Sequence, residues 1–119
     1  MTMDKIAEAS LLYDFYGQLL TEKQRQVMAL YHEENLTLSE IASEFDISRQ
    51  AVHDTLKKAE LSLTEYENKL GLVEKFVEST RAMEEIDKEI SEIASSTKDE
   101  AILTGLNRIK RIIENLEIE

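Results

Sequence analysis

Residues 37–58 read TLSEIASEFDISRQAVHDTLKK, and this stretch decides the fold. Thr37 and Glu40 have capping-box spacing, and Ser48 is a favoured N-cap, so the stretch predicts two helices, over about 38–45 and from 48 onward. Asp46 interrupts the helical pattern between them. A short helix, a tight turn and a second helix are typical of a helix-turn-helix, whose second helix can enter a major groove.

The helical period separates an inward side from an outward side in this stretch. The residues that are expected to face inward are apolar: Ile41, Ala42, Phe45, Ala51, Val52 and Leu56. The residues of the second helix that are expected to face outward are polar: Arg49, Gln50, His53, Asp54 and Lys57. An apolar inward side with a polar outward side predicts a surface helix that packs on a core and exposes its other face.

The composition of the 119 residues favours an all-α protein. Proline is absent and only three glycines occur, so few residues would interrupt helices. The absence of cysteine excludes disulfides and thiolate metal sites and fits a cytoplasmic location. No apolar run approaches the roughly 20 residues of a membrane span. We therefore expect a cytoplasmic protein without a membrane span, built as one compact domain or as a small domain with a helical extension.

Negative charge extends along the whole chain, which carries 14 Lys and Arg against 25 Asp and Glu, a net charge of −11. Residues 1–70 have 7 basic and 13 acidic residues, and residues 71–119 have 7 and 12. Such a chain is poorly suited to binding nucleic acid without regard to sequence, because that binding depends on neutralising phosphates. Any nucleic-acid binding must come from a local basic face.

The segments that flank residues 37–58 also have helical patterns. Helices are expected over about 4–20 and about 22–34, the second opened by a capping box of Thr21 and Gln24. After Ser48, apolar residues recur every three or four positions to about residue 94. The pattern predicts one long helix through Gly71, with a kink or break at Gly71 as the alternative.

A last helix is expected over about 98–117, after the linker at 94–98, with Thr97 and Glu100 as a third capping box. Its apolar residues follow heptad spacing: Ile102, Leu106, Ile109, Ile113 and Leu116. This seam suits antiparallel packing on the helix before the linker. The long apolar stripe needs a partner, either within the chain or in a second copy, and we expect a homodimer without specifying which helices meet.

Three blocks of sequence, TEKQRQVM at 21–28, LSEIA at 38–42 and ISRQAV at 47–52, resemble region four of bacterial sigma factors. With YDFYGQLLTEKQ at 13–24, the chain resembles the YlxM family of small bacterial helix-turn-helix proteins more closely. Many helix-turn-helix turns have glycine where this chain has Asp46, although Asp tolerates the left-handed conformation better than most residues. The resemblance implies a wingless helix-turn-helix domain at 1–70 and a helical extension at 71–119 that packs on it or on a second copy.

The candidate nucleic-acid site has three groups of residues. Arg49, Gln50 and His53, near the start of the second helix, are candidates for reading base edges. Lys57 and Lys58 lie a turn or more further on and would contact phosphates, while Lys23 and Arg25 could hold the flanking backbone. No catalytic or metal-ligand motif accompanies them, so we expect neither enzyme activity nor a cofactor.

Three functions remain open from the sequence. The first is a regulatory DNA-binding protein. The second, implied by the family resemblance because such proteins are encoded beside signal recognition particle genes, is an accessory protein that contacts the RNA or GTPase of that particle. The third is a helical dimerisation module whose helix-turn-helix binds no nucleic acid.

Overall fold

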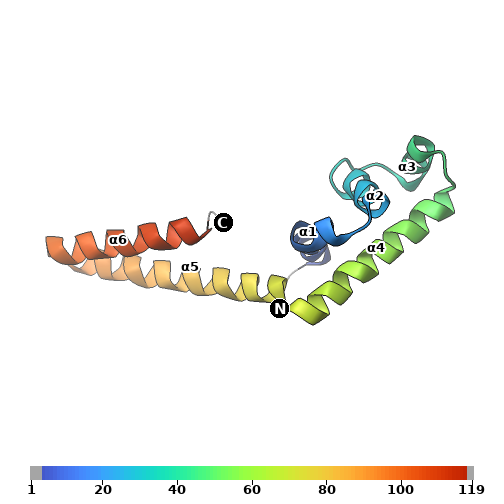
Figure 1. Ribbon diagram of the computed structural model, residues 1–119. Coiled ribbons are helices and arrows are strands. Elements are labelled where there is room, and N and C mark those ends of the chain that lie inside the picture. Colours follow the sequence, from blue (N-terminus) through green and yellow to red (C-terminus); the bar gives the residue numbers. More distant parts are fainter. Residues whose placement is uncertain (1–3, 118–119) are drawn as a thin grey trace. The chain divides into compact units, whose positions relative to one another are not determined.

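The computed structural model describes residues 4–117, in which helices and turns occur and no strand does. The elements in chain order are α1 (Lys5–Tyr16), the 3₁₀ helix η1 (Gly17–Leu19), α2 (Glu22–His32), α3 (Leu38–Phe45), α4 (Arg49–Leu70), α5 (Leu72–Ser96) and α6 (Glu100–Glu117) (Figure 1). The all-α class is confirmed. The chain divides into two compact units, Met1–Val73 and Glu74–Glu119, which are described separately below.

In the first unit, α4 is the helix on which the others pack, and α1, α2 and α3 all contact it (Figure 1). Its buried residues, Val52, Leu56, Ala59 and Leu63, recur every three or four positions and form one apolar face. The other buried apolar side chains of the first unit are Tyr16, Leu20, Val27, Met28, Ile41, Ala42 and Val73. The short helices are therefore held in place chiefly by burial of apolar surface against α4.

Local hydrogen bonds begin the helices where the sequence predicted them. Thr21 Oγ1 accepts from the Gln24 amide at 3.2 Å, and the Gln24 side chain accepts from the Thr21 amide at 3.1 Å. Thr37 and Glu40 form the same reciprocal pair at 3.1 and 3.0 Å. The Thr37 amide, by donating to the Glu40 carboxylate, lowers the pKa of Glu40. Both capping boxes are confirmed.

The turn of the helix-turn-helix depends on Asp46, which takes the left-handed conformation at φ 53° and ψ 48°. The Ile47 amide donates to the Ala42 carbonyl at 3.0 Å, and the Asp46 amide donates to the Ser43 carbonyl at 3.4 Å. These two bonds form a Schellman motif, which satisfies carbonyl groups left free at the end of α3. Aspartate therefore does here what glycine does in many such turns.

Gly71 ends α4, so the prediction of one helix running from residue 48 to about 94 is wrong, and the alternative of a break is correct. Gly71 is left-handed at φ 62° and ψ 25°, and its amide donates to the Glu67 carbonyl at 2.8 Å. Glycine reaches this conformation without the steric cost that a Cβ brings, so it ends the helix here despite the continuing apolar period.

The first amides of α5 find partners in the first unit. The Leu72 amide donates to the Tyr16 hydroxyl at 3.1 Å, and the Val73 amide donates to Glu67 Oε1 at 3.0 Å. The Tyr16 hydroxyl in turn donates to Glu67 Oε1 at 2.6 Å. Burial of Tyr16, together with its hydrogen bond to Glu67, raises the pKa of the tyrosine. This network of Tyr16, Glu67, Leu72 and Val73 stabilises the break between α4 and α5.

We expect Gly71→Ala to lower the free energy of unfolding by about 1–2 kcal/mol, because alanine must then adopt a left-handed conformation. A Cβ at this position meets no atom within 4 Å, so the cost is purely conformational. Urea unfolding followed by far-UV circular dichroism measures it. Gly105→Ala is the control, since Gly105 is an ordinary helical residue of α6 with equal space. The control should be neutral or stabilising, and an equal loss in both variants would contradict the prediction.

The second unit contains α6 and nearly all of α5, which run antiparallel as a helical hairpin (Figure 1). Lys110 Nζ lies 3.7 Å from Asp87 Oδ1 and 3.5 Å from Ser91 Oγ, which sets the register of the two helices. Asp99 begins α6, because its Oδ1 accepts from the Ala101 amide at 2.9 Å. The expected capping box of Thr97 and Glu100 is therefore wrong: Asp99 caps as well as a threonine does and lies two residues closer to the helix than Thr97.

Candidate nucleic-acid interface

The N-terminal end of α4 is exposed and begins with a cationic residue. Ser48 precedes the helix, and its Oγ accepts from the Ala51 amide at 3.0 Å. The first turn of α4 contains no acidic residue, and Arg49 is its first residue. The amides at a helix N-terminus carry a partial positive charge, to which the guanidinium adds. This end of α4 is therefore locally favourable for an anion, although the chain as a whole is acidic.

The predicted base-reading residues lie together. Arg49, Gln50 and His53 are all exposed, and with Leu38 at the start of α3 they line one open hollow of about 400 Å³. The inward side of the same turns holds buried Val52, so the hollow lies on the side of α4 away from the core. The helix-turn-helix geometry accounts for this, because the Asp46 turn brings the first residues of α3 and α4 close to each other.

Asp54 organises two of these side chains. The Gln50 Nε2 donates to Asp54 Oδ1 at 3.0 Å, and His53 Nδ1 lies 3.8 Å from the same oxygen. Asp54 thus contacts both Gln50 and His53 through one carboxylate oxygen. Gln50 keeps one amide hydrogen and its carbonyl oxygen, which are the groups that a bidentate contact with adenine needs.

The lysines further along α4 lie outside the hollow. Lys57 follows His53 by one helical turn and points to the same side of α4, whereas Lys58 is rotated from Lys57 by about 100°. Both side chains are exposed. With Lys57 beside the base-reading residues and Lys58 on the flank, this arrangement suits contacts with the phosphates that border a groove.

Lys23 and Arg25 lie in the first turn of α2 and not with the other candidates. Lys23 is exposed and Arg25 is half-buried, and neither lines the hollow at the start of α4. The Tyr13 hydroxyl lies 3.5 Å from the backbone carbonyl of Arg25 and donates to it. Burial first, and the charge of Glu33 second, raise the pKa of Tyr13. A backbone clamp formed by Lys23 and Arg25 stays a prediction.

Sequence reasoning missed Leu38 and the orienting role of Asp54. Leu38 shares the helical period of the inward residues of α3, so no sequence signal separates it from the core, yet it remains half-exposed beside Arg49. Gln50 and Asp54 are four residues apart on a helix, a spacing at which side chains meet, and this signal could have found the pair.

Within residues 4–117, no helix combines the length and apolar character that crossing a membrane requires. Across the same part of the chain, His, Asp and Glu side chains do not gather in threes that could hold a metal ion.

The sequence is similar to a family of bacterial proteins. Residues 3–102 match the model of the family UPF0122, described as "Putative helix-turn-helix protein, YlxM / p13 like". A UPF0122 protein of Desulforamulus reducens is 42% identical over 112 residues, covering 94% of this chain and 96% of the relative. One of Thermoanaerobacter pseudethanolicus is 47% identical over 107 residues, covering 90% and 92%. One of Halalkalibacterium halodurans is 42% identical over 108 residues, covering 91% and 99%.

Proposed function

Because this chain belongs to the UPF0122 family of helix-turn-helix proteins, we propose that it is a regulatory DNA-binding protein that places the start of α4 in a major groove. The observation that carries the proposal is the hollow that Arg49, Gln50 and His53 line together at the N-terminal end of α4. The first turn of α4 contains no acidic residue that would repel a phosphate. In helix-turn-helix proteins, residues at the start of the second helix read base edges. The likeness of residues 21–52 to region four of sigma factors supports the same orientation.

Each candidate residue has a distinct chemical role in this proposal. Arg49 donates to the O6 and N7 atoms of a guanine, and Gln50, held by Asp54, pairs with an adenine. His53 contacts a base edge or a phosphate. Lys57 and Lys58 contact phosphates beside the groove, and Lys23 and Arg25 hold the backbone further away. Residues 1–70 form the DNA-binding domain without a wing, and residues 71–119 form the helical extension.

The acidity of the chain limits how the protein can bind. Residues 1–70 carry 7 basic against 13 acidic residues, so most of the domain surface repels phosphates. We infer that affinity comes from a few local contacts and that sequence-independent binding is weak. The protein acts as a dimer in this proposal, because two domains that read two half-sites multiply a small number of contacts.

Arg49→Ala is expected to weaken binding to a specific DNA site by about 1–3 kcal/mol, because the substitution removes a bidentate contact with a base. The site is first selected from genomic fragments with purified protein, and affinity is then measured by fluorescence anisotropy. Lys69→Ala is the matched control, since it removes the same charge from the last turn of α4, about 30 Å from Arg49. Equal affinities of Arg49→Ala and wild type, or selection of no sequence, would refute the proposal.

A second candidate function is supported by the charge of the chain. A net charge of −11 suits a basic protein partner, and the family resemblance implies the signal recognition particle. Labelled DNA and the particle's RNA, titrated in parallel over a salt series, separate the two functions, because phosphate contacts produce a steep salt dependence. Co-elution with the GTPase at low salt, with no binding to DNA, would favour this second function. A chain that binds neither nucleic acid nor the GTPase would leave only a dimerisation module.

A further inference from the structure

The helix α6 carries two adjacent apolar stripes, and the hairpin covers only one of them. The half-buried stripe consists of Leu103, Leu106 and Ile113, with Lys110 at the remaining position of the same heptad spacing. The other stripe remains exposed and consists of Ile102 (45% exposed), Ile109 (44%), Ile112 (57%) and Leu116 (57%), also at heptad spacing. A helix in a two-helix hairpin needs one such stripe, whereas a helix in a four-helix bundle contacts two neighbours and needs both.

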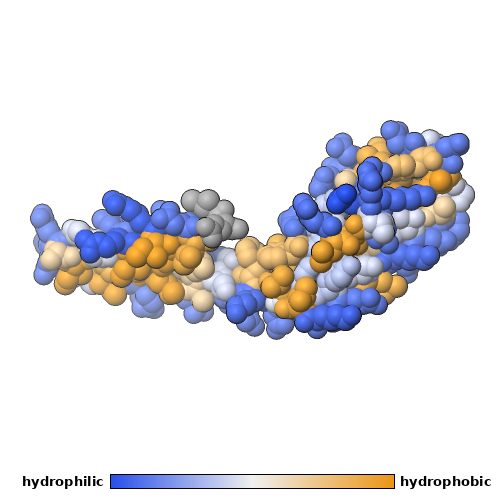
Figure 2. Space-filling view, viewed as in Figure 1, coloured by the Kyte–Doolittle hydropathy of each residue, from blue (hydrophilic) through white to orange (hydrophobic). Residues whose placement is uncertain are grey.

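The helix α5 has the same double pattern. Its covered side includes Met83, which is half-buried, and Ile90, which is 5% exposed. Its exposed stripe runs through Ala82, Ile86 and Ile93, with Ile86 and Ile93 close to half exposed. Figure 2 shows apolar surface gathered along the hairpin. Both helices of the hairpin therefore leave an apolar stripe beside their shared seam.

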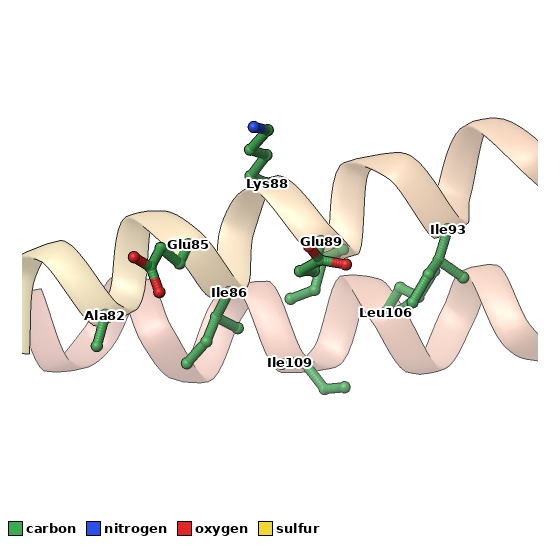
Figure 3. A pocket seen from close by; sticks show the side chains of 9 residues that line it. Ala82, Glu85, Ile86, Lys88, Glu89, Ile93, Leu106 and Ile109 are labelled. Atoms are coloured by element: carbon green, nitrogen blue, oxygen red, sulfur yellow. The ribbon is translucent and has the colours of Figure 1, made fainter.

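The two exposed stripes border one groove. Its apolar lining consists of Ala82, Ile86, Ile90, Ile93, Leu106 and Ile109, and Glu85, Lys88 and Glu89 complete the lining, around an open volume of about 600 Å³ (Figure 3). Lys88 points away from α6 in the same view. When another apolar helix surface covers the apolar side chains of this groove, water is displaced from them and the free energy falls.

The charges at the outer edges of the groove are complementary to each other. On α5, the exposed carboxylates Glu78, Glu85 and Glu92 repeat every seven residues beside the apolar stripe, on the side away from α6. On α6, the exposed cation Arg108 lies beyond the apolar stripe, on the side away from α5. The hairpin thus has carboxylates along one edge of its apolar face and an arginine at the other.

A second copy of the same chain fits this pattern. If two hairpins pack face to face about a two-fold axis parallel to the helices, α5 of each copy lies along α6 of the other. The contact between Lys110 and Ser91 places Arg108 at about the same height along the hairpin as Glu92. A rotation about an axis parallel to the helices does not change this height, so Glu92 of each copy then meets Arg108 of the other, twice by symmetry. A partner with one uniform charge would match only one of the two edges.

We propose that this apolar face of the α5–α6 hairpin is a dimerisation surface on which two copies form an antiparallel four-helix bundle. The inference identifies the surface of the dimer in the proposed function, and it stands on residues 74–117 alone. Association is measured without nucleic acid, so failure of this inference and failure of DNA binding are distinguishable.

Light scattering after size exclusion tests the dimer with the full chain. The expected mass is twice the 13.7 kDa of the chain. Ile109→Glu adds a charge to the exposed stripe and should give a monomer, with helicity checked by circular dichroism. Asn107→Glu is the matched control, because Asn107 is exposed on the opposite side of α6, and it should remain dimeric. A monomeric wild type, which is also the result if residues 1–73 cover the groove, would overturn the proposal, as would a dimeric Ile109→Glu.

A charge exchange tests which helices meet. Arg108→Glu and Glu92→Arg should each weaken association by about tenfold at low salt, since each places like charges together at two symmetric positions. The double variant restores opposite charges and should return the dissociation constant close to that of the wild type. If both single variants weaken association and the double variant does not recover, the pairing of α5 with α6 of the second copy is wrong.

Discussion

Replacing Tyr16 with alanine is expected to lower the free energy of unfolding of the first unit by about 3–5 kcal/mol. Tyr16 is 1% exposed, and its ring lies 6.0 Å from that of Tyr66, centroid to centroid. Its loss leaves a cavity where α1 packs on α4. It also removes the hydroxyl that accepts from the Leu72 amide and donates to Glu67. Both losses act at the point where α4 ends.

Urea unfolding followed by tyrosine fluorescence measures this effect in the first unit alone. All four tyrosines, at positions 13, 16, 31 and 66, belong to Met1–Val73, and the chain has no tryptophan. Tyr16→Phe separates packing from hydrogen bonding, because the ring remains and only the network is lost, at a cost of about 1–3 kcal/mol. Phe15→Ala is the control for a neighbouring aromatic residue that is 37% exposed. A loss in Phe15→Ala as large as that in Tyr16→Ala would contradict the assignment of Tyr16 to the core.

Ile41→Ala is expected to destabilise the first unit by about 2–5 kcal/mol, because it removes a fully buried side chain between α3 and α4. Ile41 is 0% exposed, and α3 has only eight residues. A helix of that length does not persist in water without tertiary packing. We therefore expect α3 to detach before the rest of the unit unfolds, which would also separate Leu38 from Arg49.

Hydrogen exchange of the α3 amides, combined with the same fluorescence measurement, tests this order of events. Protection in α3 should fall more than protection in the middle of α4, where Ala59 and Leu63 remain buried. Ser43→Ala, on the exposed side of α3, should leave both quantities nearly unchanged. Uniform loss of protection across the unit would show that α3 does not open on its own.

The predicted nucleic-acid site and the proposed dimer have a common logic. With 13 acidic residues in positions 1–70, a single domain offers few favourable contacts to DNA. Doubling those contacts through a bundle of α5 and α6 raises affinity without adding positive charge, because the second domain binds at high effective concentration. Ile109→Glu should accordingly weaken binding to a two-half-site fragment more than binding to a single half-site.

Local chemistry made much of this fold readable from the sequence. The helix starts at Thr21, Thr37 and Ser48 depend on hydrogen bonds over two or three residues, so the residue types suffice to predict them. The outward position of Arg49, Gln50 and His53 follows from the helical period, because the apolar face must be buried. The left-handed turn at Asp46 is local as well.

Other features depended on contacts between distant segments. The apolar period continues through Gly71, which permits a break but does not require one. The Tyr16 hydroxyl and the Glu67 carboxylate stabilise the break, because they accept from the first amides of α5. The half-exposed position of Leu38 follows from how α3 meets α4.

For residues 37–58, then, the sequence by itself determined the helix-turn-helix and its polar face, because capping and helical period act over a few residues. Only the tertiary structure decided where the second helix stops and which side chains share a hollow. Tyr16 stabilises the helix end through hydrogen bonds with Glu67, 51 positions away, and with Leu72, 56 positions away. Contacts between residues so far apart leave no periodic signal in the sequence.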